Sequence, residues 1–264
     1  MEIKKRNVFI TGANRGIGRA FAVECAKDQA HLFLVVRQMK GHEEFVQELE
    51  SQGAKSVQLI EADLSRPVAV KELCEMAQDL QVDILFNNAG MLTGGLFEDQ
   101  EWQDIQQMFQ VNQIALMQLT QALLPGMLKR KRGKIINNSS VAAIMQFPCA
   151  STYAASKAAV LAFTNSLKQE LRGTGVSTLL LITPGIKTRM YDQISELYGS
   201  HIEFEPSSQI STTQYARMIR EAVIEDLEEL KPAQLTATGL GLTVAQYLPK
   251  IFQLGVRQKF SRKK

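Results

Sequence analysis

A short apolar segment, a glycine-rich turn and an amphipathic helix follow one another within the first 28 residues and constrain the fold more than any other feature. Residues 7–10 are mostly β-branched or aromatic, and residues 16–28 have helical apolar spacing. Glycines let a phosphate approach main-chain amides, and a helix N-terminus offers unpaired N–H groups. The pattern predicts a nucleotide site, whereas the alternative is an ordinary glycine turn. Its candidate residues are Gly12, Asn14, Arg15, Gly16, Ile17 and Gly18.

Further apolar segments alternate with helical patterns along the chain. They predict strands at residues 31–36, 56–60, 83–86, 134–138 and 176–182, and residues 233–237 are a candidate seventh strand. This alternation predicts an α/β fold, a Rossmann-type doubly wound parallel sheet with helices on both faces. A chain of 264 residues accommodates one large domain of this kind, so we expect a single domain over residues 1–264.

The end of the second predicted strand bears on the choice of cofactor. Sites for NAD place an acid there to bind the ribose 2′-hydroxyl, whereas a 2′-phosphate calls for an arginine. This chain has Arg37 at that point, and Arg15 lies within the glycine turn. We therefore predict that NADP(H) is preferred over NAD(H). The alternative is that both arginines are ordinary solvated side chains.

Three residues near the middle of the chain suggest proton transfer. Tyr153 and Lys157 are four positions apart, so on a helix they share one face. A phenol titrates near pH 10 in water, and a neighbouring cation stabilises its anion and lowers its pKa. The Ser140 hydroxyl is then placed to hold a carbonyl oxygen beside the phenol. The alternative is a surface tyrosine and lysine at common helical spacing.

Together these motifs resemble the short-chain dehydrogenase/reductase family over roughly residues 5–190. TGANRGIG occupies 11–18, NNAG occupies 87–90, and Ser140, Tyr153 and Lys157 have the spacing S-x12-Y-x3-K. The resemblance implies that Tyr153 transfers a proton, that Ser140 orients the substrate oxygen, and that Lys157 also binds the nicotinamide ribose. It implies that Asn112 kinks the helix expected over residues 100–128 and holds a water connecting Lys157 to solvent. The alternative for Asn112 is a polar side chain facing solvent.

The resemblance also implies cofactor contacts beyond the glycine turn. It implies that Asp63 accepts a hydrogen bond from the adenine amine. The alternative is that Asp63 caps a helix that begins near Ser65, and the two roles are compatible. We expect Ser151 to cap the helix over residues 151–172 that carries Tyr153. The implied contacts outside the turn are Arg37, Asp63, Leu64, Asn88, Ala89, Gly90, Tyr153, Lys157, Pro184, Gly185 and Thr188.

Residues 189–230 correspond to the mobile substrate lid of the family. The segment 189–209 has few regular signals, and residues 212–230 predict an amphipathic helix. Apolar residues here and in other loops predict a pocket for an apolar substrate, although such residues are more often ordinary core. The candidate substrate contacts are Leu92, Phe147, Met190 and Tyr191, and further pocket candidates are Met91, Met145, Leu197, Tyr198 and Phe204.

Residues 231–264 depart from the common family ending. Residues 242–254 predict an extra helix interrupted at Pro249, and a basic tail follows over residues 257–264. One interpretation is docking on an anionic membrane, but we favour subunit contact or packing over the active site. The family also implies a homodimer or homotetramer formed through the long helices.

Charge and cysteine content narrow the possible partners, metal sites and cellular location of the protein. A formal net charge of +3 does not indicate a nucleic-acid partner. Three cysteines without metal-ligand spacing indicate free thiols, no metal site and a reducing, cytoplasmic location. We thus predict an NADPH-dependent reductase, or reversible alcohol dehydrogenase, for a small apolar ketone, aldehyde or secondary alcohol. The alternatives are a cofactor-recycling epimerase or dehydratase, and a nucleotide-binding regulatory protein without turnover.

Overall fold

A single parallel sheet forms the centre of the computed structural model, which describes residues 1–198, 201–202, 210–233 and 236–262. Its seven strands have the order β3-β2-β1-β4-β5-β6-β7, and every neighbouring pair is parallel. The order reverses between β1 and β4, where the carboxyl ends of strands open a crevice for ligands. The strands are β1 (Asn7–Thr11), β2 (His31–Val36), β3 (Ser56–Glu61), β4 (Ile84–Asn87), β5 (Gly133–Asn138), β6 (Val176–Leu181) and β7 (Glu229–Leu230).

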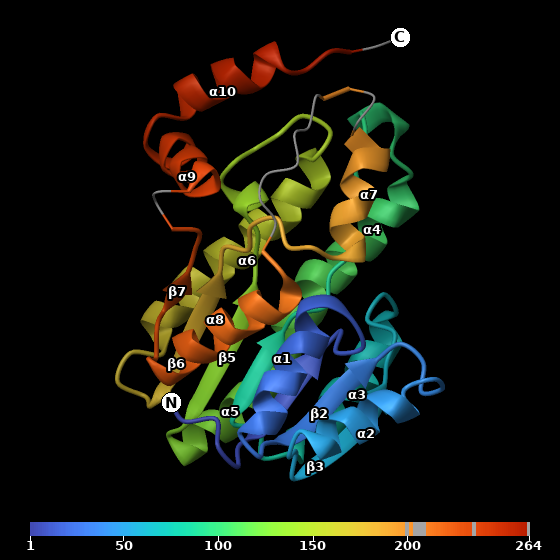
Figure 1. The fold of residues 1–264 in the computed structure, drawn as a ribbon, viewed down its shortest axis with the longest axis vertical. Coiled ribbons are helices and arrows are strands. Elements are labelled where there is room, and N and C mark those ends of the chain that lie inside the picture. Colours follow the sequence, from blue (N-terminus) through green and yellow to red (C-terminus); the bar gives the residue numbers. More distant parts are fainter. Residues whose placement is uncertain (199–200, 203–209, 234–235, 263–264) are drawn as a thin grey trace.

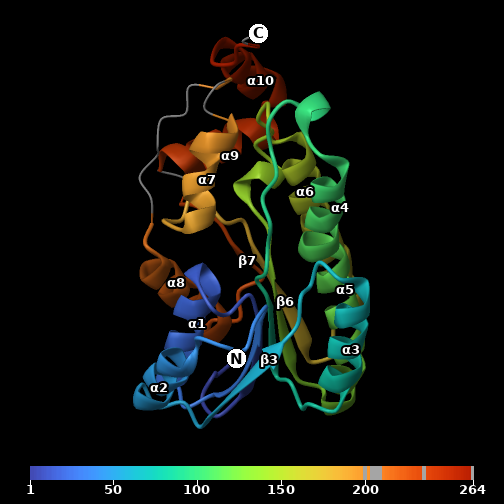
Figure 2. The same ribbon diagram turned by 90° about the vertical axis from the view of Figure 1, so that its right-hand side faces the viewer.

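Helices cover both faces of the sheet (Figures 1 and 2). One face carries α1 (Gly16–Lys27), α2 (Glu43–Ser51) and α8 (Thr212–Ile224). The other carries α3 (Pro67–Gln78), α5 (Ala115–Arg130) and α6 (Ser151–Glu170). The doubly wound parallel sheet predicted from the alternation of strands and helices is confirmed.

The strands supply the core on both of their faces. Val8 and Ile10 of β1 are buried against α1 and α8, whereas Phe9 between them is buried against the layer of α3 and α5. Because alternate strand residues point to opposite faces, a strand covered on both sides is apolar throughout. This explains why β1 and β2 contain short uninterrupted apolar segments in the sequence.

The long helix expected over residues 100–128 is interrupted. It consists of α4 (Trp102–Phe109), a π-helical segment (Gln110–Ile114) and α5. Asn112 lies in the π-helical segment, where one extra residue per turn interrupts the i→i−4 ladder. Pro125 lies inside α5 and does not end it; the chain leaves the helix at Lys131, which has a left-handed φ of 52°.

The prediction for the end of the sheet was wrong in position. The seventh strand is β7 at residues 229–230, and α8 ends at Ile224 rather than continuing to Leu230. Of the predicted strand 233–237, residues 234 and 235 lie outside the described part, and Ala237 begins a helix. A two-residue strand at a sheet edge is too short to produce a periodic signal, which explains the misplacement.

Two helices rather than one interrupted helix close the chain. They are α9 (Ala237–Tyr247) and α10 (Pro249–Gln258). Pro249 occupies the first position of α10, where its missing N–H costs nothing, and the break falls at Leu248. Together with α4, the start of α6 and α7 (Arg189–Tyr198), these helices project beyond the carboxyl ends of the strands (Figure 1). Helix α7 forms where we expected little regular structure.

Candidate active site

The glycine turn predicted from the first residues lies between β1 and α1. Gly12 and Gly16 have positive φ angles of 64° and 59°, which favour glycine. A Cβ on Gly18 would lie 2.5 Å from the Gly12 carbonyl oxygen and from Asn88 Nδ2, so only glycine lets α1 approach this closely. Helix α1 has no side-chain cap and no acid in its first turn. Its N-terminal amides are therefore available to an anion.

Three arginines gather at the outer end of this turn. Burial lowers the pKa of Arg15, and the charges of Arg37 and Arg189 lower it further. Within the described residues none of the three forms an ion pair with a carboxylate. Three positive charges that lie together and pair with no carboxylate suit the binding of an anion. Sequence reasoning missed Arg189, although it directly follows Thr188.

These residues line a groove of about 550 Å³, which we call the cationic groove. It runs along the carboxyl ends of β1, β2 and β4. Asp63 lies in it, but its carboxylate accepts hydrogen bonds from the Ser65 amide and hydroxyl. Helix α3 begins two residues later at Pro67, so Asp63 does not cap it directly. The predicted cofactor residues that line it are Gly12, Asn14, Arg15, Gly16, Ile17, Arg37, Asp63, Leu64, Asn88, Ala89, Gly90 and Thr188.

The NNAG motif joins the ends of β1 and β4. Asn88 Nδ2 donates to the carbonyl oxygens of Thr11 and Gly12, at 3.0 and 3.2 Å. Thr11 Oγ1 accepts from the amides of Asn88 and Ala89, both at 3.0 Å. These bonds fix the floor of the cationic groove. The supporting role of Thr11 was not recognised from the sequence.

Ser140, Tyr153 and Lys157 converge at the carboxyl end of β5. Tyr153 and Lys157 lie on α6, and Ser140 precedes a 3₁₀ turn at Val141–Ala143. Ser140 and Tyr153 line the same pocket, and Ser140 Oγ accepts a hydrogen bond from the Ala142 amide at 3.2 Å. The Lys157 ammonium lies 5.9 Å from the centre of the Tyr153 ring and donates to the Asn138 carbonyl oxygen at 2.8 Å.

The pKa of the phenol differs from the prediction. Tyr153 lies partly open to a pocket, and burial raises its pKa to about 12, although the hydrogen bond with Ser140 lowers it. Burial lowers the pKa of Lys157 to about 8. The predicted lowering of the phenol pKa by Lys157 is not seen, because desolvation outweighs the other effects. The phenol is therefore protonated at neutral pH.

Asn112 links the π-helical segment to the loop after β4, which carries Met91, and to α6, which carries Ser156. Its Oδ1 accepts from the Met91 amide at 2.7 Å, and its Nδ2 donates to the Met91 carbonyl and to Ser156 Oγ. The side chain is buried, so the alternative of a solvent-facing asparagine is wrong. A Cβ on Gly90 would lie 3.5 Å from Asn112 Oδ1 and 3.7 Å from Lys157 Nζ. Both polar groups thus face the space over Gly90.

A second, smaller space of about 180 Å³ lies over Tyr153, and we call it the apolar pocket. All four predicted substrate residues, Leu92, Phe147, Met190 and Tyr191, line it, as do Tyr198, Ile194 and Ile202. Sequence reasoning missed the two isoleucines. Met91 lines the cationic groove instead, Leu197 and Met145 pack in neighbouring apolar clusters, and Phe204 lies outside the described residues.

The loop after β6 joins the two spaces. Pro184 and Gly185 line the apolar pocket, whereas Thr188 lines both. The Thr188 side-chain oxygen accepts from the Tyr191 amide at 3.3 Å in the first turn of α7. Ser151 was expected to cap α6, but it is the first residue of that helix, and its side chain caps no amide.

The cationic groove fits a dinucleotide. Its glycine turn leaves room for a pyrophosphate, its arginines suit a phosphate, and Gly90 leaves open the place where the groove meets Lys157. Fold and site together define a Rossmann-type nucleotide-binding protein with a serine, a tyrosine and a lysine at the end of its groove.

Comparison with known proteins identifies the family. A family model described as short chain dehydrogenase matches residues 6–198. The ketoacyl reductase HetN of Nostoc is 31% identical over 251 residues, which cover 92% of this chain and 85% of HetN. The chain belongs to the short-chain dehydrogenase/reductase family and is an oxidoreductase of the kind that acts on CH–OH groups.

Two further similarities support this assignment. Human 17-beta-hydroxysteroid dehydrogenase type 3 is 33% identical over 183 residues, which cover 69% of this chain but only 59% of the human protein. A short chain dehydrogenase/reductase from Burkholderia phymatum, solved in complex with NAD, superposes with a TM-score of 0.80 at 26% identity. The match covers 100% of this chain and 99% of the Burkholderia chain. A nicotinamide cofactor is consistent with these relatives.

Proposed function

We propose that the protein is an NADPH-dependent reductase of small apolar ketones or aldehydes, reversible toward secondary alcohols, with Tyr153 as the general acid and base. The observation that carries this proposal is the convergence of Ser140, Tyr153 and Lys157 on the apolar pocket. That pocket adjoins the cationic groove, so a carbonyl in the pocket lies beside a cofactor in the groove.

The side chains divide the work of carbonyl reduction. When bound, the nicotinamide supplies the hydride. The Ser140 and Tyr153 hydroxyl groups donate to the carbonyl oxygen, and Tyr153 then gives up its proton as negative charge develops there. Because burial raises the pKa of Tyr153 to about 12, the phenol enters the reaction protonated. In this form it can act as the general acid of the reductive direction.

Lys157 and Asn112 support that proton transfer. The Lys157 ammonium faces the space over Gly90, where it is placed to bind the nicotinamide ribose. Asn112 holds Ser156, which lies between Tyr153 and Lys157 on α6. In the proposal, Asn112 thereby fixes the helix face that carries both groups and borders a path for a proton from solvent to Lys157.

The preference for NADPH rests on charge. Arg15, Arg37 and Arg189 form a cluster that suits the dianionic 2′-phosphate through charge-assisted bonds. Among the described residues that line the groove the one acid is Asp63, and its carboxylate accepts from Ser65. The NAD in the Burkholderia structure belongs to a relative, and the arginines of this chain favour the phosphorylated cofactor.

The apolar pocket supports the proposed substrate class. Methionine, leucine, isoleucine and aromatic side chains surround the hydroxyl pair, and no charged side chain other than Lys157 lines the described pocket. The names of HetN and of the human relative also indicate ketones with apolar bodies. We place the substrate between α7, which belongs to the proposed lid 189–230, and Phe147. The lid and the C-terminal residues 231–264 belong, in this proposal, to the single domain 1–264.

The test follows NADPH and NADH absorbance with ketones and aldehydes of increasing apolar length. We expect turnover with NADPH, a steep dependence on substrate size, and little turnover with charged sugars. A protein that binds NADPH tightly but turns over no member of the series would contradict the proposal and favour a regulatory role. Net NADPH consumption separates reduction from epimerisation, which returns the cofactor unchanged.

A further inference from the structure

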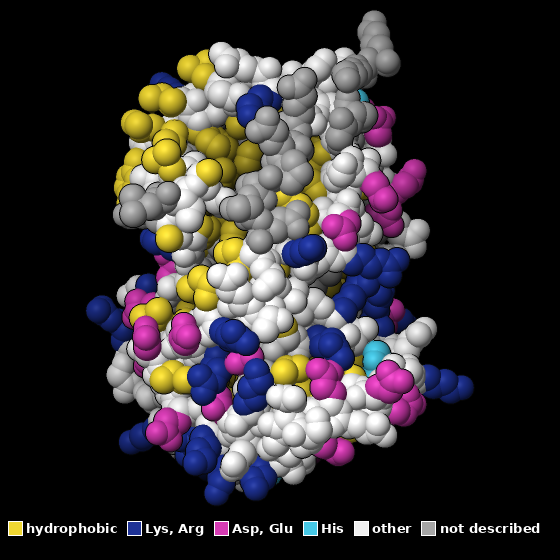
Figure 3. Space-filling model, viewed as in Figure 1, with side chains coloured by type: hydrophobic (Ala, Val, Ile, Leu, Met, Phe, Trp, Pro, Cys, Tyr) yellow, Lys and Arg dark blue, Asp and Glu magenta, His cyan; other side chains and the backbone are white. Residues whose placement is uncertain are grey.

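Helices α9 and α10 turn apolar residues away from the protein. On α9, Leu242 and Ala245 are buried, whereas Leu240 and Tyr247 on the opposite side are 62% and 72% exposed. On α10 no residue is fully buried, and Ile251 and Leu254 are 58% and 59% exposed. We call Leu240, Tyr247, Leu248, Ile251 and Leu254 the C-terminal apolar face. Figure 3 shows hydrophobic side chains gathered over this part of the molecule.

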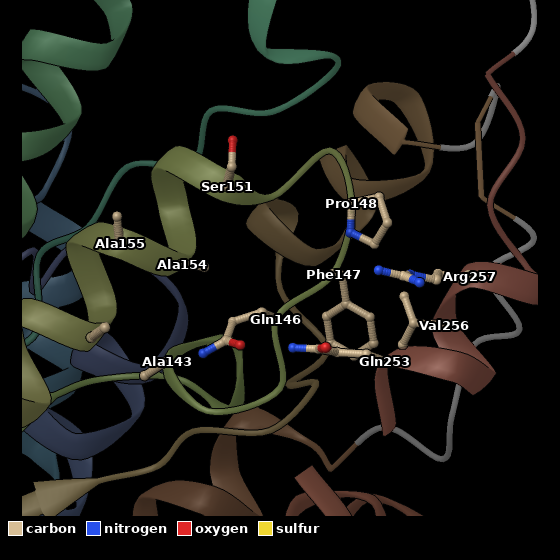
Figure 4. A pocket seen from close by; sticks show the side chains of 11 residues that line it. Ala143, Gln146, Phe147, Pro148, Ser151, Ala154, Ala155, Gln253, Val256 and Arg257 are labelled. Carbon is tan, nitrogen blue, oxygen red and sulfur yellow. The ribbon is translucent and has the colours of Figure 1, made fainter. Parts of the chain in front are cut away.

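The inner sides of the two helices are already occupied. Leu242 packs with Leu180 and Ile182 at the end of β6. Phe252 of α10 meets Phe147 edge to face, with the ring centres 5.7 Å apart. Figure 4 shows Gln253, Val256 and Arg257 of α10 directed toward the loop of Phe147 and Pro148. The described part of the chain therefore leaves the C-terminal apolar face largely exposed.

Charge indicates what covers this face. Residues 231–264 contain seven lysines and arginines and no aspartate or glutamate. With +3 for the whole chain and +7 for this segment, the rest of the chain carries −4. Lys250 on α10 and Lys259 directly after its last residue are both exposed. Arg262 and Lys231 pair with Glu98 and Glu229 from other parts of the chain, whereas Lys250 and Lys259 form no ion pair among the described residues. An apolar face on a basic segment that has no acid of its own is typical of a helix lying in an anionic lipid surface.

The same charge argues against pairing of this face with itself. A twofold contact would bring each patch against its own copy, and thus lysines against lysines. Within the described residues no helix is long and apolar enough to cross a bilayer. The geometry thus favours a peripheral contact, with the helices lying in the interface.

We propose that α9 and α10 dock the protein on an anionic lipid surface through the C-terminal apolar face. This proposal takes the interpretation that the sequence analysis did not favour. Subunit contact stays an untested expectation, and the expected packing of α10 toward the pocket is seen at Phe252. Because Phe147 lines the apolar pocket and touches α10, docking brings the pocket close to the membrane. Apolar substrates dissolved in lipid then reach the site directly.

Sedimentation with lipid vesicles tests the proposal on the full chain. One set of vesicles is pure phosphatidylcholine, and the other mixes it with an equal part of phosphatidylglycerol. We expect the protein to sediment with the second set only. Replacement of Lys250 and Lys259 by glutamine should weaken partitioning by about thirtyfold, since each surface cation contributes about 1 kcal/mol.

A triple variant, Leu248→Ser, Ile251→Ser and Leu254→Ser, should abolish sedimentation but keep turnover of a water-soluble ketone. The matched control replaces Val68, Ile224 and Leu227, which are exposed elsewhere, by serine and should sediment normally. Absence of binding to anionic vesicles, or equal binding by the triple variant, overturns the proposal. A triple variant that instead changes the oligomeric state identifies the face as a contact between copies. If the protein docks but turns over no carbonyl, only the proposed reaction fails.

Discussion

The cationic groove and the apolar pocket share one cleft but are built from different parts of the chain. The groove follows the carboxyl ends of the first strands and is fixed by hydrogen bonds between backbone and short polar side chains, as at Asn88 and Thr11. The pocket is assembled from loops and from α7. Ile194 and Tyr198 of α7 pack against Phe147 mainly through apolar contacts. The groove is thus a property of the sheet, whereas the pocket depends on how distant segments close over it.

The largest effect should come from removing the phenol hydroxyl. Tyr153→Phe should lower kcat by about 10³-fold, since a positioned general acid contributes about 10²–10⁴-fold. The affinity for NADPH should change little, because the groove is built by other residues. Steady-state kinetics measure the loss of kcat, and fluorescence titration measures the affinity for NADPH. Retained turnover would falsify the role of Tyr153.

Removal of one arginine should affect the groove alone. Arg37→Ala should raise the KM for NADPH about tenfold or more, since a bond to a charged group contributes about 1.5–3 kcal/mol. The KM values for NADH and for the ketone should stay nearly constant. Lys129→Ala, an exposed cation on α5, is the control. An equal loss for both cofactors would mean that Arg37 does not read the 2′-phosphate.

A glycine substitution should affect the pocket alone. A Cβ on Gly94 would lie 1.9 Å from Cε1 of Tyr198, whose hydroxyl donates to the Thr93 carbonyl. Gly94→Ala should therefore displace Tyr198 and α7 and raise the KM for the ketone several-fold, about 1 kcal/mol of lost contact. The KM for NADPH should not change. Gly255→Ala, which meets nothing within 4 Å, is the control, and equal kinetics for both variants would contradict a closed pocket.

The smallest effect should appear in the dependence on pH. Burial lowers the pKa of Lys157 from 10.5 to about 8, so this group is cationic below that pH and neutral above it. If its ammonium supports the reaction, kcat/KM for NADPH should fall as the pH rises through about 8, while Tyr153 stays protonated. Lys157→Met should lose this limb, and Lys168→Met on the same helix should keep it. A flat wild-type profile up to pH 10 contradicts the assignment.

Local patterns predicted the glycine turn well because its residues are close in sequence. Gly12, Gly16 and Gly18 lie in one turn, and the strand that precedes them is apolar on both faces. The pocket was predicted only by residue type. Leu92 and Phe147 lie where expected, but Met91 turned to the groove and Met145 to a neighbouring cluster, since one residue along a loop reverses the side that a side chain faces.

The errors occurred where local preference was overruled by contacts. The pattern over residues 100–128 was helical throughout, and only the family resemblance implied a kink at Asn112; in the structure Asn112 bonds Met91 and Ser156 from within a π-helical segment. Proximity of a lysine predicted a lowered pKa for Tyr153, but desolvation, which depends on everything packed around the ring, raised it. The contacts of Asn112 and the desolvation of Tyr153 both involve residues distant in sequence, so no fixed residue spacing predicts them.

By itself the sequence determined the parallel sheet, the glycine turn and the alignment of Tyr153 with Lys157, because each follows from the periodicity of strands and helices over a few residues. Only the tertiary structure brought Arg189 toward Arg15 and Arg37, set the protonation of the phenol, and turned Ile251 and Leu254 outward. The burial of a side chain and the electrostatic field around it depend on neighbours distant in sequence, which come together only when the chain folds.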